Sequence, residues 1–82
     1  MFDWRIGEGG VSWANNCDFK DQDLSTAQVR GEKCGKTCIE TKGCTHFSWT
    51  TFNNGTCRMK WGEVTKDDAI INADREGACG II

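Results

Sequence analysis

Six cysteines are the residues of this chain with the clearest chemistry, and four of them lie between Cys34 and Lys60. Cys34 and Cys38 are four residues apart, so on a helix both sulfurs lie on one face, one turn apart. Two side chains stacked in this way have nearly parallel Cβ vectors and bridge each other poorly. Each is therefore expected to form a disulfide with a cysteine outside the helix.

A helix and a β-hairpin are the elements that must position these cysteines. The helix is expected from Glu32 to Thr41, with Gly31 as its N-cap, and alone it would be marginal in water. Residues 45–52 are rich in aromatic and β-branched side chains and predict a strand. The turn signal Asn-Asn-Gly at 53–55 and a return strand at 56–61 complete the hairpin.

The helix and the hairpin together predict three disulfides: Cys34–Cys57, Cys38–Cys44 and Cys17–Cys79. The first joins the first turn of the helix to the hairpin, and the second closes a short loop after the last turn. The third pairs the two cysteines that are left and ties the ends of the domain together. Spacing alone would allow about fifteen connectivities for six cysteines, so this pairing depends on the predicted elements.

The pattern C-x3-C-x5-C-x2-F-x-W, followed by C-x-M-K, resembles the PAN/apple domain family. The residues that carry it are Cys34, Cys38, Cys44, Phe47, Trp49, Cys57, Met59 and Lys60. The similarity covers roughly residues 16 to 80, and the apple family uses the same disulfide pairing. Trp49 stands where a Tyr or related aromatic is usual, and residues 1–15 have no counterpart in the motif. The resemblance implies a non-catalytic module that binds proteins or carbohydrates outside cells.

The length of 82 residues predicts one domain with a small core, which disulfides commonly reinforce. An even number of cysteines in so short a chain indicates an oxidising compartment, so we expect a secreted or extracellular protein. Further short strands are expected at 11–19, 24–29, 69–71 and 78–82. The prediction is an α+β fold in which one short helix packs on a five- or six-stranded, mostly antiparallel sheet.

Residues 1–15 read as a lead-in to the domain at 16–82, either flexible around its glycines or added as an edge strand. The helix is expected to bury Cys34, Cys38 and Ile39 against the sheet. Strand alternation puts Trp49 and Trp61 on the face toward the helix.

Several functional classes fit the composition poorly. The net charge of −2, with both signs interspersed, argues against nucleic acid and gives no polybasic anchor for a membrane. The chain has no C-x2-C pair and one histidine, so zinc spacing is absent. Asp18, Asp21 and Asp23 lack the spacing of an EF-hand, and a solvated turn explains them better. We therefore expect no metal, no cofactor and no membrane insertion.

His46 and Ser48 are the residues closest to a catalytic pair, because alternation puts them on one strand face. A base and nucleophile also need an orienting acid and an oxyanion hole, and the sequence supplies neither. With every cysteine assigned to a disulfide, a Cys-His pair is also excluded. We expect no enzyme activity.

Recognition is the remaining function, and two kinds of ligand are open. A lectin-like module would use Trp4, Trp13 and the outward hairpin side chains, which are His46, Ser48, Thr50, Arg58 and Lys60. A protein-binding module for adhesion or protease regulation would use Phe52, Arg58 and Lys60 as anchors, since Arg and aromatic residues often dominate interfaces. Both hypotheses place the ligand on the outer face of the sheet. A structural bead in a longer extracellular protein is a further alternative. Asn54, in Asn54-Gly55-Thr56, is a candidate N-glycosylation site.

Overall fold

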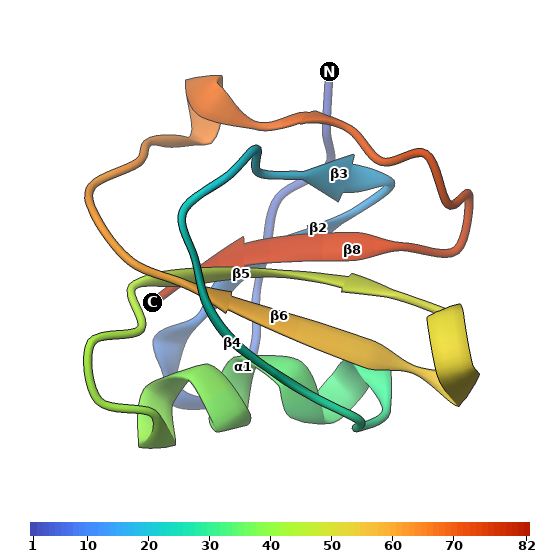
Figure 1. Ribbon diagram of the computed structural model, residues 1–82. Helices are drawn as coiled ribbons and strands as arrows, with labels where there is room; N and C mark the ends of the chain where they lie inside the picture. Colours follow the sequence, from blue (N-terminus) through green and yellow to red (C-terminus); the bar gives the residue numbers. More distant parts are fainter.

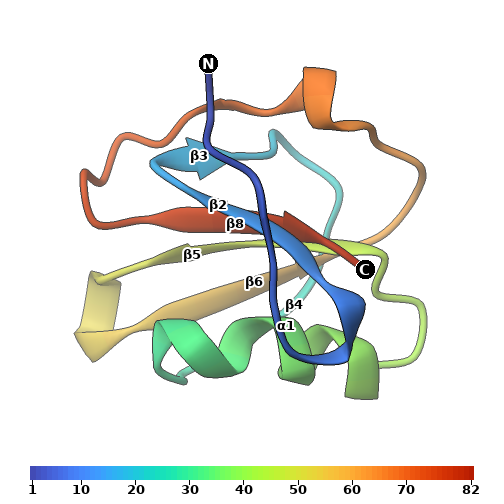
Figure 2. The same ribbon diagram turned by 180° about the vertical axis from the view of Figure 1, so that it is seen from behind.

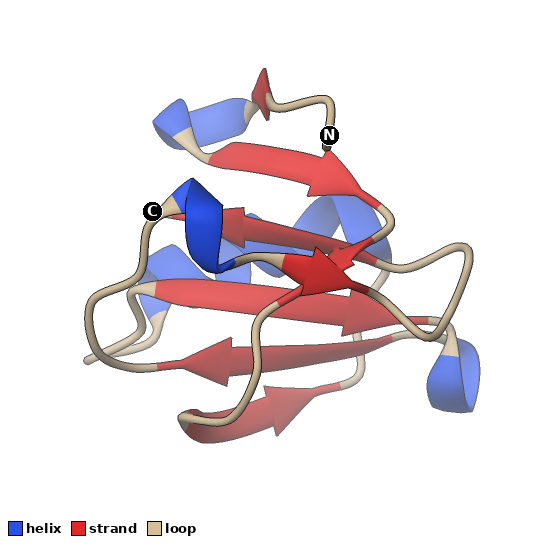
Figure 3. Cartoon of the chain, turned by 90° about the horizontal axis from the view of Figure 1, so that it is seen from above, coloured by secondary structure: helices blue, strands red, loops and turns tan.

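The computed structural model describes residues 1–82 and shows three layers (Figures 1 and 3). The middle layer is a six-stranded antiparallel sheet. Its spatial order is β1 (Arg5–Ile6), β2 (Ser12–Asn15), β8 (Ala78–Ile81), β5 (His46–Thr50), β6 (Thr56–Lys60) and β4 (Asp23–Ala27). The helix α1 (Gly31–Glu40) covers one face, and a second sheet of β3 (Cys17–Asp18) and β7 (Ile70–Ile71) covers the other. The predicted α+β class is confirmed.

Three short 3-10 helices connect these elements: η1 (Glu8–Gly10), η2 (Phe52–Asn54) and η3 (Lys66–Asp68). The hairpin of β5, η2 and β6 follows the predicted ranges closely, with His46 opposite Lys60 and Thr50 opposite Thr56. Residues 1–15 contribute β1, an edge strand, and also β2, which lies inside the large sheet. The view from behind shows this N-terminal segment running along the edge of the sheet, from the level of β3 down to the level of α1 (Figure 2).

All three predicted disulfides are present: Cys17–Cys79, Cys34–Cys57 and Cys38–Cys44. They divide between two small cores on opposite faces of the sheet. Five of the six sulfurs belong to fully buried residues, and Cys44 packs half-buried against the helix-side core. Because both cores are small, the cross-links carry a large share of the packing on each face.

The helix begins one residue earlier than expected, at Gly31, and Arg30 is its N-cap. Cys34 and Cys38 are buried against the sheet, as predicted. Ile39 is not: its side chain is exposed, and its Cδ1 atom lies beside Gly9 of η1. The stripe that the helix buries is therefore narrower than the sequence suggested, since only residues separated by a full turn face the sheet.

Two predicted strands end at other residues than expected. The segment 11–19 is not one strand, because Asn16 has a φ of 66°, and the turn it forms moves the chain from β2 in the large sheet to β3 in the second sheet. The strand β6 ends at Lys60, so Trp61 lies beyond the alternation and is 51% exposed instead of facing the helix. Its backbone N–H donates to the carbonyl of Gln22 at 3.0 Å.

Candidate functional site

The strand β8 carries two small residues, Ala78 and Gly80, on the face toward the helix. The sheet register places Gly80 between Trp13 of β2 and Phe47 of β5. A Cβ atom on Gly80 would lie only 2.3 Å from Cζ of Phe47, so the ring leans over the bare backbone of this strand. The Phe47 ring therefore fills the space above Gly80, and the part of β8 that stays open lies at Ala78.

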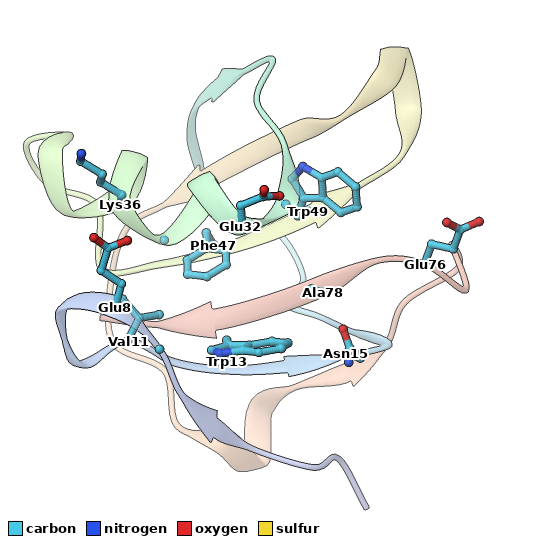
Figure 4. Close-up of a pocket in the computed structure, with 13 residues that line it drawn as sticks. Glu8, Val11, Trp13, Asn15, Glu32, Lys36, Phe47, Trp49, Glu76 and Ala78 are labelled. Atoms are coloured by element: carbon cyan, nitrogen blue, oxygen red, sulfur yellow. The ribbon is translucent and has the colours of Figure 1, made fainter.

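A small residue again lies between larger ones two residues away along β8. Ala78 lies between Asn15 of β2 and Trp49 of β5. The two tryptophans, Trp13 and Trp49, therefore stand on strands on either side of β8, as Figure 4 shows.

Two glycines, Gly31 and Gly35, give the helix a bare stripe where it meets these aromatic rings. They are four residues apart and thus lie on one face. A Cβ at Gly31 would be 3.4 Å from the indole of Trp49, and a Cβ at Gly35 would be 3.3 Å from the methyl groups of Val11. The absence of side chains here lets the helix lie close to the sheet beside the open part of β8.

The resulting cavity, here named the helix-face groove, has a volume of about 470 Å³ (Figure 4). One wall is α1, the other is the turn at Gly7 and Glu8, and the floor comes from β2, β8 and β5. This volume lies within the range of small-molecule binding sites, which are mostly apolar with a few polar groups.

Both tryptophan rings are held in place by the fold. The indole N–H of Trp49 donates to the carbonyl of Val29 at 2.8 Å, and the ring packs half-buried against the helix-side core. Trp13 packs half-buried against the same core, and the guanidinium of Arg5 lies 5.9 Å from its ring centroid. Rings fixed in this way offer a preorganised apolar surface, because little side-chain entropy is lost when a ligand binds.

Polar side chains surround the aromatic floor. Glu8, Asn15, Glu32, Lys36 and Glu76 all line the groove and are exposed. Figure 4 shows Glu8 and Glu76 at opposite ends of the groove and Glu32 on the helix side. Carboxylate and amide oxygens can accept hydrogen bonds, and the amide of Asn15 can also donate. The groove thus combines flat apolar surface with hydrogen-bonding groups at its rim.

The outer face of the sheet is not the open polar surface that the sequence suggested. His46, Ser48 and Lys60 are 0%, 1% and 3% exposed, respectively. The small sheet of β3 and β7 covers the face of the large sheet away from the helix (Figure 3). The Cys17–Cys79 disulfide and Asn72 fix that layer, since Asn72 Nδ2 donates to the carbonyl of Cys17 at 2.9 Å. The expected exposure of these three residues is wrong, because two-residue strands give too weak a pattern to predict the covering layer.

The buried polar groups of this face are only partly paired. Lys60 Nζ donates to the carboxylate of Asp23 and, at 2.8 Å, to the carbonyl of Asp21. His46 Nδ1 lies 2.8 Å from the hydroxyl of Thr45. Burial lowers the pKa of His46, and the Lys60 ammonium lowers it further. His46 Nε2 and the hydroxyls of Ser48 and Thr50 have no hydrogen-bond partner within the chain.

The other predicted ligand residues are spread over the surface. Phe52 is exposed on η2, and Arg58 is half-buried on β6, 3.9 Å from the carboxylate of Asp23. Trp4 packs against the core on the β3 side, with the ammonium of Lys66 5.6 Å from its ring centroid. Of the predicted ligand residues, only Trp13 lines the helix-face groove.

The aspartates at 18, 21 and 23 lie in β3, in the turn that follows and at the start of β4. Asp18 accepts a hydrogen bond from the backbone of Phe19, and Asp21 adopts a φ of 61° in the turn.

Asn54 is exposed at the hairpin tip, while the hydroxyl of Thr56, the third residue of its sequon, donates to the carbonyl of Phe52 at 2.7 Å. No helix of this chain is long and apolar enough to cross a membrane.

No family model, curated protein or solved structure matches this chain. The function must therefore be argued from the geometry of the molecule. Small residues that line the groove are visible in the sequence, among them the glycines at 31 and 35 and the alanine at 78. Their spacing alone does not predict a site.

Proposed function

We propose that this chain is a non-catalytic recognition module that binds carbohydrate in the helix-face groove. The observation that carries the proposal is the pair of fixed tryptophan rings, Trp13 and Trp49, on either side of the shallow strand β8. The C–H face of a sugar ring can pack on such flat apolar surfaces, while its hydroxyls meet the polar rim at Asn15 and the glutamates. The proposal moves the binding site from the outer sheet face to the helix side.

The burial of the outer face supports a role without catalysis. His46 is the one histidine of the chain, and its imidazole is fully covered, so no ligand can contact it in this conformation. A general base must come within hydrogen-bond reach of the proton that it removes. The polar groups that do reach solvent at the groove are suited to binding.

We also propose an extracellular location and membership of the PAN/apple family. Three disulfides in a domain this small are typical of extracellular proteins. Their pairing agrees with the pairing that the PAN/apple resemblance implies, which supports the assignment. In such a setting Asn54 is a site at which a eukaryotic secretory pathway would add a glycan.

The test is a binding screen of the oxidised protein against soluble and insoluble glycans, read by tryptophan fluorescence and pull-down. We expect a saturable signal that free sugar competes away. Trp13→Ala should weaken the affinity by about tenfold or more, as expected for a central aromatic contact. Trp61→Ala is the matched control, because this exposed ring lies outside the groove.

Thermal melts of both variants must show that they are folded at the assay temperature. If the two variants lose affinity for the glycan equally, or if neither loses affinity, the glycan does not bind in the groove. If no glycan binds at all, the carbohydrate proposal is overturned, and a protein partner becomes the ligand to seek.

A further inference from the structure

We infer that the ligand of the helix-face groove is a glycan with protonated amino groups, of the glucosamine type with free amines. The inference rests on the proposed carbohydrate binding and adds the chemical class of the sugar. It comes from the charges that line the groove and from which of them are already paired within the chain.

Three carboxylates line the groove, and they come from three different parts of the fold. Glu8 belongs to η1, Glu32 to the first turn of α1, and Glu76 to the loop before β8. Lys36 is the one cationic residue among the lining residues. The formal charge of the lining is thus −2, from three glutamates and one lysine, although the groove is built around apolar rings.

Two of the three carboxylates have no cationic partner in the chain. Glu32 lies 3.7 Å from the guanidinium of Arg30, and both side chains are largely exposed. Glu8 and Glu76 form no ion pair within 4.0 Å, and the same holds for Lys36. Figure 4 shows the two unpaired carboxylates at opposite ends of the groove, with the tryptophan rings between them.

This distribution of charge selects among sugars that stack equally well on Trp13 and Trp49. Uronic and sulfated glycans would meet like charges at both ends, which suppresses binding. Neutral glycans would use only the apolar floor and hydrogen bonds. Amino groups along a cationic glycan would meet opposite charge at both ends, and a cation near a tryptophan face gains a cation–π contribution.

The experiment compares three oligosaccharides of equal length: an oligomer of glucosamine, an oligomer of N-acetylglucosamine and an oligomer of a uronic acid. Each is titrated into the oxidised, folded protein while the affinity is measured by calorimetry and tryptophan fluorescence. The expected order of affinity is glucosamine first, N-acetylglucosamine second and uronic acid last. The ratio of the affinity for the glucosamine oligomer to the affinity for the N-acetylglucosamine oligomer should shrink when the ionic strength rises from about 0.05 M to about 0.5 M. At the higher ionic strength exposed charges are screened.

The decisive variant is Glu8→Gln combined with Glu76→Gln, which removes the unpaired charges and keeps the side-chain shapes. We expect the preference for the glucosamine oligomer over its N-acetylated form to fall about two- to thirtyfold, the range for two exposed ion pairs. The control is Glu40→Gln with Glu63→Gln, which removes the same charge at exposed sites outside the groove.

The control matters because a polycation is attracted to any protein with a pI near 5.2. If both double variants lose the preference equally, the attraction is nonspecific and the inference is overturned. If the N-acetylated oligomer binds as tightly as the free amine, the inference also fails while the carbohydrate proposal stands. If none of the three oligosaccharides binds, the inference is overturned, and the proposed function falls as well when the wider glycan screen is also negative.

Discussion

The ring of Phe19 meets the imidazole of His46 edge-on, with the two ring centroids 5.1 Å apart. Both residues are fully buried, and they join the layer around β3 to the central strand β5 of the large sheet. The buried Lys60 ammonium also lowers the pKa of the imidazole, while the Asp68 carboxylate raises it by a smaller amount. A second positive charge at this place would be costly, because burial disfavours the charged form.

We therefore expect the protein to lose stability as the pH falls below the ordinary His pKa of about 6.5. The pKa of His46 is lowered in the folded state, so between that lowered value and 6.5 the unfolded chain binds a proton that the native protein does not. The contribution of His46 to the free energy of unfolding should thus be complete above about pH 6.5 and should decrease as the pH falls from there to the pKa of His46 in the folded protein. Urea unfolding at about pH 5 and about pH 7.5 measures the difference.

His46→Gln removes this titration and should reduce the difference in urea midpoint between the two pH values. The direct measurement is the pH dependence of the His46 imidazole signals in NMR spectra. A titration midpoint at or above about 6.5 would contradict the assignment.

The three disulfides enclose loops of very different length, and we expect them to differ in their contribution to stability. The paired cysteines are 62, 23 and 6 residues apart for Cys17–Cys79, Cys34–Cys57 and Cys38–Cys44. The chain-entropy model gives about 4, 3 and 2 kcal/mol in that order. Paired Cys→Ser variants, unfolded in urea one disulfide at a time, measure each contribution. An unchanged melting temperature for the Cys34→Ser/Cys57→Ser variant would refute the role assigned to the link between helix and hairpin.

The sequence predicted the helix, the hairpin and the two disulfides of the helix because each depends on a local signal, and Cys17–Cys79 followed as the pair that was left. The four-residue spacing of Cys34 and Cys38, the Asn-Asn-Gly turn and the alternation in β6 are all readable over a few residues. The second sheet leaves a weaker signal. The predicted strand at 69–71 is present as β7, but nothing in the sequence indicates that it pairs with β3 in a separate sheet, because the two strands pair only two residues each and Ile70 and Ile71 are both exposed.

Register explains why the outer face was expected to be exposed although it is covered. Alternation correctly puts His46, Ser48 and Lys60 away from the helix, but it cannot say what covers that side. Lys60 can be buried there because the Asp23 carboxylate and the Asp21 carbonyl satisfy its ammonium, and these contacts span more than 35 residues of sequence. The groove likewise depends on which residues of β2 and β5 lie beside β8, and one sequence does not give long-range pairing.

Asp74 fixes the end of the β5–β6 hairpin, and we expect Asp74→Asn to loosen it. The Asp74 carboxylate accepts hydrogen bonds from the backbone N–H and the hydroxyl of Thr51, at 2.7 and 2.6 Å, and from the N–H of Glu76 at 2.9 Å. The bonds from Thr51 hold the pKa of Asp74 below its ordinary value. A lowered carboxyl pKa contributes stability that is present above its ordinary value near 4 and is lost as the pH falls through the folded pKa.

Hydrogen exchange measures whether the hydrogen bonds between Asp74 and Thr51 hold the end of the hairpin. The Thr51 amide should exchange faster in Asp74→Asn, and the loss of stability below about pH 4 should be smaller than in the original protein. Asp67→Asn, on the exposed 3-10 helix η3, is the matched control and should change neither property. Equal exchange of the Thr51 amide in all three proteins would show that the carboxylate does not hold the hairpin.

Gly80 makes room for the Phe47 ring, which lines the helix-face groove, and we expect Gly80→Ala to destabilise the protein by about 1–3 kcal/mol, as added methyl groups do in packed cores. The new Cβ would lie 2.3 Å from Cζ of Phe47 and 2.9 Å from the carbonyl oxygen of Ser12. The clash with the Phe47 ring is the closer of the two, so Phe47→Leu should relieve part of the cost. Urea unfolding of the two single variants and the double variant gives their coupling energy, expected to be at least about 0.5 kcal/mol for residues in contact. If the two losses simply add, the Phe47 ring does not rest on Gly80.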